Sequence, residues 1–263
     1  MASIVTLTTD FGLSDAFVGA MKGVILSRCP AAQLVDLTHE VPPQAIRTGA
    51  LRLASAAPYF PAGTVHLVVV DPGVGGDRRP LAIEARGHFL VGPDNGVLSL
   101  TADPSTAGWR AVVLTNLGHR LEQVSNTFHG RDVFAPAAAH LACGGRLDDL
   151  GDPVTAIVRL RLPPAVREAD QIHGLVLDID RFGNLITNIH ADDLAGATVV
   201  EIAVADVRID RLSRSYDPRF DVVAVIDGDD RLEIASPGGS AARKFDVALD
   251  TPVVVQLSPS AGR

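Results

Sequence analysis

The segment VVVDPGVGGDRRP, residues 68–80, changes from apolar to charged within one step, and its residue types could do chemistry. Pro72 pushes Asp71 towards an extended backbone, and three glycines allow the chain to turn sharply and approach a ligand closely. Arg78 could then fold back towards Asp71. A carboxylate and a guanidinium held this way could line a ligand site, although an ordinary surface ion pair on a flexible loop would also explain them.

Other acids follow strand-like runs. Asp10 ends the first such run in TLTTDFG, and Asp94 lies in the turn GPDNG. In an open α/β sheet, ligands bind at the carboxyl ends of strands, so these acids could line one cleft with Asp71. Asx-turns that satisfy local amides are an equal alternative. A metal site that also includes His129 is conceivable, but it has no diagnostic spacing.

Two further segments carry polar residues where a regular pattern breaks. In NTFHGRDVFAPAAAHLACGG, residues 126–145, His129 lies on a turn before an alanine-rich helix, and Asp132 suits the helix start as a cap or surface charge. In LDIDRFGNLITNI, residues 177–189, the pattern predicts a hairpin turn. Asp180 and Asn184 would present hydrogen-bonding groups there, side by side.

The elements that position these residues follow from the apolar pattern. Up to about residue 162, short apolar runs alternate with amphipathic segments, which predicts an N-terminal α/β domain with a mainly parallel central sheet over residues 1–163. Its first helix should have Ser14 as N-cap. Prolines and charges predict a linker at 164–171. Short alternating runs predict a small C-terminal antiparallel sheet or barrel over 172–263.

Composition bounds the class of protein. The 263 residues are 47% hydrophobic and carry a formal charge of -8, so a nucleic acid partner is not expected. No basic and apolar leader and no run of about 18 apolar residues is present, which predicts a cytoplasmic protein without membrane insertion. In that reducing compartment, Cys29 and Cys143 should be buried thiols rather than a disulfide.

The chain resembles the S-adenosyl-L-methionine (SAM) hydroxide adenosyltransferases, relatives of the fluorinating and chlorinating enzymes that use the same substrate. The resemblance covers nearly the whole chain and rests on six segments in the family's order: TLTTDFGLSDAFVGAMKGVI, VDLTHEVPPQ, VVVDPGVGGDRRP, VGPDNGVL, NTFHGRDVFAPAA and LDIDRFGNLITNI. It implies an α/β domain followed by a β-barrel domain, a homotrimer with substrate between subunits, and hydrolysis of SAM to adenosine and L-methionine.

The resemblance also implies roles for single residues. The family's catalytic triad corresponds to Asp71, Arg78 and His129, with Arg78 rather than Arg79 in the motif's position. Asp10 resembles the residue that binds the ribose hydroxyls. Asp180 and Asn184 resemble contacts to the methionine portion and nearby nucleoside atoms, and the backbone from Ser236 to Gly238 corresponds loosely to the adenine contacts. No metal and no cofactor is implied, since SAM is the substrate.

Three alternatives stay open. A halide-using, chlorinase-like adenosyl transferase would share most of these residues. A non-catalytic protein that binds SAM or adenosine would need Asp10 and Asp180 but not the Asp71, Arg78 and His129 set. A metal-dependent phosphoesterase would use the acids and His129 as ligands and would lose its activity on chelation.

Overall fold

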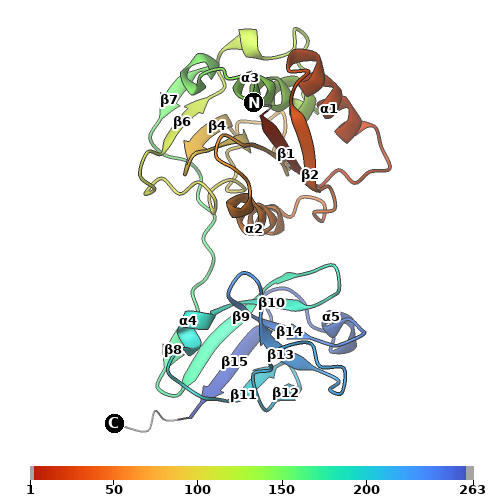
Figure 1. Cartoon of the computed structure of the whole chain (residues 1–263), viewed down its shortest axis with the longest axis vertical. Coiled ribbons are helices and arrows are strands. Elements are labelled where there is room, and N and C mark those ends of the chain that lie inside the picture. The colour runs from red at the N-terminus through yellow and green to blue at the C-terminus, as the bar shows by residue number, and fades with distance from the viewer. Residues whose placement is uncertain (1–2, 259–263) are drawn as a thin grey trace. The chain divides into compact units, whose positions relative to one another are not determined.

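The computed structural model describes residues 3–258 of the chain, which divide into two compact units (Figure 1). The first unit is Met1–Leu160 and the second is Arg161–Arg263. Each has its own hydrophobic core, so each is described by itself.

The first unit is built on one seven-stranded sheet with the order β2-β1-β3-β5-β4-β6-β7. Its strands are β1 (Ile4–Thr9), β2 (Gln33–Thr38), β3 (Val65–Val69), β4 (Pro80–Ala85), β5 (His88–Pro93), β6 (Arg110–Val113) and β7 (Asp152–Val154). The four strands β2, β1, β3 and β5 are parallel, and β4, β6 and β7 add an antiparallel edge. The predicted fold class is confirmed, with a mixed sheet around a parallel centre.

Helices cover both faces of this sheet. One core contains residues of α1 (Phe17–Arg28) and α3 (Ala135–Ala142), and the other contains residues of α2 (Ile46–Ala56). Four shorter turns of helix complete the unit: η1 (Ala57–Tyr59), η2 (Leu117–His119), η3 (Gly130–Phe134) and η4 (Leu147–Leu150). Every residue of β3 is buried, as expected for a parallel strand with helices on both sides.

One detail of α1 differs from the sequence prediction. The helix begins at Phe17 with Ala16 as N-cap and no side-chain capping bond, so the prediction of Ser14 as N-cap was wrong. The residues before Phe17 form bends that belong to the loop after β1. A serine ahead of an amphipathic run is only a local signal, and the loop geometry determines where the helix begins.

The parallel strands place three acids at one edge of the sheet. Asp10 follows β1, Asp71 lies two residues beyond β3, and Asp94 follows β5. Because β1 pairs with β3 and β3 pairs with β5 in the same direction, their carboxyl ends meet at this edge. The edge is where an α/β sheet of this kind binds ligands.

The second unit is an antiparallel barrel with the order β12-β11-β15-β9-β10-β14-β13. Its strands are β8 (Val166–Glu168), β9 (Gln171–Ile179), β10 (Leu185–His190), β11 (Val199–Val204), β12 (Val207–Ile209), β13 (Val223–Ile226), β14 (Arg231–Ala235) and β15 (Pro252–Leu257), with the short helices α4 (Ala191–Leu194) and α5 (Ala241–Lys244). A bridge from Leu212 to Ala224 nearly closes it. β8 pairs with β9, so part of the predicted linker is a strand of this unit.

The prediction of two buried thiols was wrong. Cys29 is buried, whereas Cys143 is exposed, and the two form a disulfide with a Cα–Cα distance of 5.7 Å. Cys29 follows α1 and Cys143 follows α3, and these helices pack against each other. The two cysteines are 114 residues apart in the chain, so their spacing carried no sign of this pairing.

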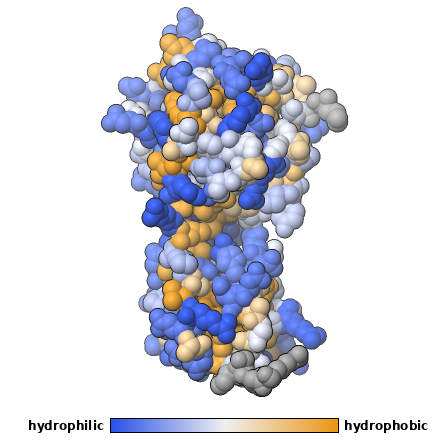
Figure 2. Space-filling view, turned by 90° about the vertical axis from the view of Figure 1, so that its left-hand side faces the viewer, coloured by the Kyte–Doolittle hydropathy of each residue, from blue (hydrophilic) through white to orange (hydrophobic). Residues whose placement is uncertain are grey.

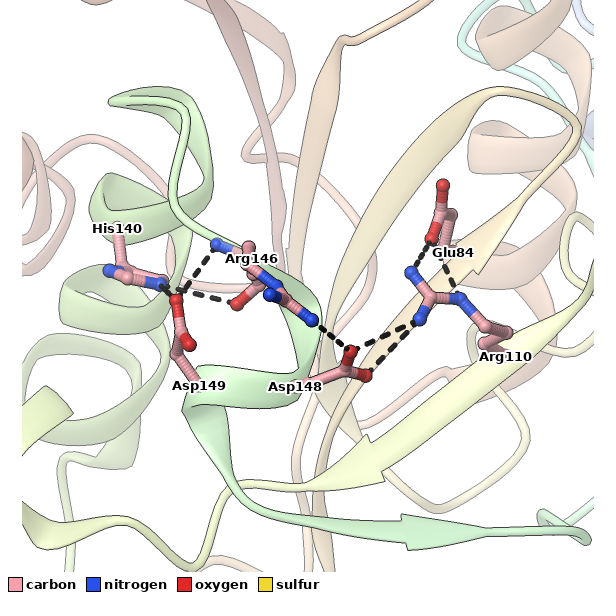
Figure 3. A network of polar contacts seen from close by, with 6 residues as sticks. All are labelled: Glu84, Arg110, His140, Arg146, Asp148 and Asp149. Atoms are coloured by element: carbon pink, nitrogen blue, oxygen red, sulfur yellow. Dashed lines mark hydrogen bonds and ion pairs between the residues drawn. The ribbon is translucent and has the colours of Figure 1, made fainter.

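A polar network on the first unit ties η4 to its surroundings (Figure 3). Arg110 of β6 donates to Glu84 of β4 and to Asp148 of η4, while His140 of α3 contacts Asp149. The side chain of Arg110 is 53% exposed, so these ion pairs contribute little to stability each. The network is a surface feature separate from the three acids at the sheet edge.

The surface carries both hydrophilic and apolar residues. On the face drawn in Figure 2, hydrophilic residues cover much of the surface of each unit, and hydrophobic residues form smaller patches among them. Within residues 3–258, no helix combines the length and the hydropathy that crossing a membrane requires.

The disulfide generates a stability prediction. The double variant Cys29→Ala/Cys143→Ala should lower the free energy of unfolding of the first unit by about 2–4 kcal/mol, because the cross-link restricts the unfolded chain. Urea denaturation in oxidising buffer measures this. Wild-type protein treated with a reductant should lose a similar amount, and the variant should not respond to the reductant. Two titratable thiols in unreduced, unfolded wild-type protein would contradict the bridge.

Candidate active site

The centre of the site is a buried ion pair between Asp71 and Arg78. Arg78 Nε donates to Asp71 Oδ1 at 2.9 Å and to Oδ2 at 3.0 Å, and a terminal nitrogen donates to Oδ2 at 2.5 Å. The side chain of Asp71 is 4% exposed and that of Arg78 is 9% exposed. The guanidinium also lies over the Phe134 ring, 5.3 Å from its centroid. The alternative of an ordinary surface pair on a flexible loop therefore does not apply.

His129 contacts this ion pair through Arg78. The contact shows which nitrogen of the imidazole ring holds the proton. A terminal nitrogen of Arg78 lies 2.8 Å from His129 Nδ1. A guanidinium has donors only, so Nδ1 must be the acceptor, and the ring is neutral with its proton on Nε2. Burial, followed by the charge of Arg78, lowers the pKa of His129, which also favours the neutral ring. His129 Nε2 can thus donate to a further acceptor.

Gly75 lets the loop after β3 that carries Asp71 (the Asp71 loop) approach the chain that carries His129, residues 126–134 (the His129 segment). Its φ is +76°, and a Cβ there would lie 2.3 Å from the carbonyl oxygen of Asn126. Only glycine fits both the backbone conformation and the close contact. The loop that follows β3 is therefore packed directly on the chain leading to His129.

Asp132 also fixes the position of the His129 segment, and the sequence analysis missed this role. Its side chain is fully buried and accepts from the backbone N–H of Ser125 at 2.8 Å and from Arg131 Nε at 2.6 Å. Asp132 lies in the first turn of η3, as predicted, but the alternative of a surface charge was wrong. η3, which begins directly after His129, is one turn of π-helix, a form often found at functional sites.

Three phenylalanines join the Asp10 loop to the His129 segment. Phe11 and Phe128 are the neighbours of Asp10 and His129, and both contact Phe17 at the start of α1. The ring centroids are 5.3–6.0 Å apart with edge-to-face geometry, which aromatic pairs favour. Asp10 and the triad residues are thereby held on one packed region.

The three acids at the sheet edge have different partners. Asp10 Oδ2 accepts from the backbone N–H of Gln44 at 2.8 Å, and its side chain is half-buried. Asp94 instead binds Arg79, which donates to Oδ2 at 2.8 Å, and the N–H of Val158 at 2.7 Å. Asp94 is thus occupied by structural contacts. In the part of the chain that the structure describes, no cluster of His, Cys, Asp and Glu could hold a metal ion.

The second unit carries a cavity of about 550 Å³ that contains all the site residues predicted there. It is lined by Asp180, Asn184, Ser236 and Gly238. Asp180 Oδ1 accepts from the backbone N–H groups of Phe182 and Asn184, and Asn184 Nδ2 donates to Asp180 Oδ2 at 3.1 Å. These bonds shape the turn and also fix the position of the carboxylate at the cavity wall.

Among the lining residues that were not predicted, three have aromatic or charged side chains. Phe182 and Tyr216 supply aromatic rings and Arg243 supplies a cation. Burial and the neighbouring Glu233 raise the pKa of Tyr216 to about 12, so its hydroxyl stays protonated and can donate. Phe182 lies in the FGN turn already singled out, whereas Tyr216 and Arg243 come from segments whose patterns gave no signal.

An α/β unit with an Asp-Arg-His arrangement built on a buried ion pair, followed by an antiparallel barrel with a cavity, defines the class of this chain. Comparison with known proteins then identifies the family. The SAM hydroxide adenosyltransferase N-terminal domain matches residues 5–151, and the corresponding C-terminal domain matches residues 174–254. The chain belongs to this family, which confirms the resemblance drawn from the six segments.

Individual relatives agree with this assignment. The chain is 43% identical over 247 residues to the (R)-S-adenosyl-L-methionine hydrolase of Salinispora tropica, covering 90% of this chain and 92% of the relative. It is 40% identical over 254 residues to the protein of the same name from Thermus thermophilus, covering 93% and 96%. A fluorinase of Actinoplanes is 30% identical over 224 residues, covering 74% of each chain.

A solved structure agrees as well. The crystal structure of an uncharacterized conserved protein from Thermotoga maritima superimposes with a TM-score of 0.87 at 34% sequence identity. The match covers 96% of this chain and 99% of that chain. The likeness extends over both units of the fold.

The close contact at Gly75 predicts the effect of a single methyl group. Gly75→Ala should lower turnover strongly, because the added Cβ would overlap the Asn126 carbonyl and move the Asp71 loop away from His129. Gly63→Ala is a matched control, since Gly63 also has a positive φ of +85° but no atom near its Cβ position. Steady-state kinetics on both variants measures the effect. Equal turnover in the two variants would contradict the proposed role of the loop.

Proposed function

We propose that this protein hydrolyses SAM to adenosine and L-methionine through attack of water at C5′ of the ribose. The observation that carries the proposal is the contiguous contact of Asp71, Arg78 and neutral His129 at the ligand-binding edge of the sheet. Relatives that are 39–48% identical to this chain bear the name (R)-S-adenosyl-L-methionine hydrolase. A protein that only binds SAM would not need this arrangement.

In the proposed reaction, a bond forms between the water oxygen and C5′ while the bond from C5′ to sulfur breaks. The bonding electron pair goes to sulfur, which leaves as the neutral thioether of methionine, so no general acid is needed. The difficult partner is water. An anionic nucleophile that meets a cationic sulfonium disperses charge, which a pocket with little water favours.

The triad residues have separate parts in this step. His129 Nε2 donates to the water oxygen and orients it, because Nδ1 is already occupied by Arg78. With neither ring nitrogen free to accept, the Asp71 carboxylate is the group left to take the water proton. Arg78 holds both side chains and offsets the negative charge that develops on the attacking oxygen.

Substrate binding is assigned to the remaining predicted residues. Asp10 binds the ribose hydroxyls, and Asp180 and Asn184 bind the methionine portion and nearby nucleoside atoms. The backbone from Ser236 to Gly238 contacts adenine. The support is that the last four residues line one cavity and that Asp10 is joined to the His129 segment by packed rings.

A homotrimer with sites shared between neighbouring subunits is also proposed. The family resemblance supports it. The site residues are divided between both units of the chain, and a site formed within one chain is the alternative. A cytoplasmic location stays a prediction, and the Cys29–Cys143 bridge weighs against it because disulfides persist mainly in oxidising compartments.

The reaction itself is tested by identifying products. Purified protein incubated with SAM should release adenosine and methionine, with and without chloride and in the presence of EDTA. The fluorinase relatives make a halide reaction the second candidate, and 5′-chloro-5′-deoxyadenosine as the main product in chloride would establish it instead. Tight SAM binding without any product would indicate a binding protein, and loss of activity on chelation would indicate a metal enzyme.

Variants should separate chemistry from binding. Arg78→Ala should lose about 10²–10³-fold in kcat with a much smaller loss of affinity, as expected when charge stabilisation is removed. Asp10→Ala should instead weaken binding by roughly 10–100-fold, because a hydrogen bond to a charged group contributes about 1.5–3 kcal/mol. Calorimetry with SAM and steady-state kinetics measure both effects. Arg79→Lys, which keeps a cation beside Asp94, is the control; equal affinity losses for Arg78→Ala and Asp10→Ala would contradict the assignment.

Shared sites are tested by mixing two inactive variants. Subunits carrying His129→Ala and subunits carrying Asp180→Ala are unfolded together and reassembled into mixed oligomers, whose composition is checked by mass spectrometry. If sites join neighbouring subunits, some sites combine two intact halves, and adenosine production should return. Confirmed mixed oligomers that stay inactive, made from variants that each fold and assemble alone, would contradict shared sites.

A further inference from the structure

A buried histidine lies beside the loop that carries Asp10 and has no part in the proposed mechanism. His39 follows β2, which pairs with β1 in the same direction, so it lies at the same edge of the sheet as Asp10. It is 3% exposed. Because a buried polar ring is costly without polar partners, the partners of His39 show what it holds in place.

Both nitrogens of this ring have a polar neighbour. Nδ1 lies 2.8 Å from Oγ1 of Thr9, which is also buried. Nε2 lies 3.0 Å from Asp36 Oδ1, a contact at ion-pair distance that lacks the alignment of a hydrogen bond. Asp36 Oδ2 in turn accepts from Lys22 Nζ at 2.6 Å. A lone pair on Nε2 would face a negative oxygen, so in the neutral ring the proton is on Nε2 and Nδ1 accepts from the Thr9 hydroxyl.

These contacts reach the backbone on both sides of Asp10. Thr9 directly precedes Asp10, and its Oγ1 accepts from the N–H of Phe11, the residue that directly follows, at 3.3 Å. The carbonyl oxygen of His39 accepts from the N–H of Gly12 at 2.8 Å. His39 therefore holds the start of this loop twice, through its ring and through its own backbone.

The proposed task of Asp10 depends on such support. A carboxylate that accepts from two ribose hydroxyls has to be held at a fixed position and angle, because hydrogen bonds weaken steeply when they are misaligned. The N–H of Gln44 fixes one oxygen of Asp10 at 2.8 Å. The backbone on either side of Asp10 fixes the direction in which the side chain leaves the loop.

We propose that His39 is a positioning residue for ribose recognition, which acts through Thr9 to hold the Asp10 carboxylate where it accepts from the ribose hydroxyls. The inference rests on the proposed function, in which Asp10 binds the ribose, and adds a residue outside the predicted site. His39 itself touches no substrate atom. If it only filled the core, its loss would lower stability without a selective effect on ligands that carry ribose hydroxyls.

A second buried histidine of the same unit is a matched control. His66 of β3 is fully buried, and its Nδ1 lies 2.7 Å from Oγ1 of Thr6, which also belongs to β1. The two histidines thus make the same kind of contact to the same strand. The contact of His39 adjoins Asp10, whereas that of His66 lies nearer the middle of the strand.

The test measures by calorimetry the binding of adenosine and of 2′,3′-dideoxyadenosine, which lacks both ribose hydroxyls. The wild type should prefer adenosine. His39→Leu should weaken adenosine binding by about tenfold, the scale of one lost hydrogen bond, and leave dideoxyadenosine binding unchanged. His39→Asn keeps an acceptor close to the position of Nδ1 and should retain most of the preference. His66→Leu should lower the thermal midpoint but keep the wild-type preference.

Kinetics on the same variants provides the second readout. In His39→Leu, KM for SAM should rise by about tenfold while kcat changes little, the opposite of the pattern expected for Arg78→Ala. Thr9→Val, which removes the hydroxyl and keeps the side-chain shape, should have the same effect and replaces His39→Leu if that variant fails to fold.

Asp10→Ala separates failure of the inference from failure of the proposed function. If Asp10→Ala loses the preference for adenosine but a folded His39→Leu variant keeps it, the inference is overturned and the proposed function stands. If Asp10→Ala also keeps the preference, the assignment of Asp10 to the ribose is wrong and the inference fails with it. Unfolding of both His39→Leu and Thr9→Val would assign the pair a structural role instead.

Discussion

The buried ion pair between Asp71 and Arg78 is the interaction on which the site depends. Two charges taken out of water are costly, and their attraction offsets that cost only if further polar contacts satisfy them. Here the guanidinium contacts both carboxylate oxygens, His129 Nδ1 and the face of Phe134. This arrangement fixes the proton of His129 on Nε2 and leaves Asp71 as the group that accepts the water proton. The contacts of Arg78 therefore determine which group donates to the water and which accepts from it.

The surrounding fold serves to hold that pair and His129 at a fixed separation. β3 delivers Asp71 from the fully buried centre of the sheet, and Gly75 allows its loop to touch the chain that carries His129. Asp132 secures the same chain from within the unit. Because β3 and Asp132 are buried and Gly75 leaves no room for a Cβ, small changes at these supports should alter turnover more than binding.

Much of this could be predicted from the sequence because its signals are local. Unbroken apolar runs predicted the parallel strands. The choice of Arg78 over Arg79 came from the family resemblance, and in the structure Arg78 contacts Asp71 whereas Arg79 pairs with Asp94. Features that depend on tertiary packing could not be predicted. The Cys29–Cys143 bridge needs two helices to meet, and the role of Asp132 depends on its complete burial. Tyr216 reaches the barrel cavity from a segment without a regular pattern.

The central claim is that water attacks C5′ directly, and the stereochemistry at that carbon tests it most directly. SAM made chiral by a single deuterium at C5′ would be converted, and the configuration of the adenosine would be determined by NMR. In-line attack by water held between Asp71 and His129 predicts inversion. Retention would contradict the account, because it requires two displacements through an intermediate, such as an ester on Asp71 or a halogenated nucleoside.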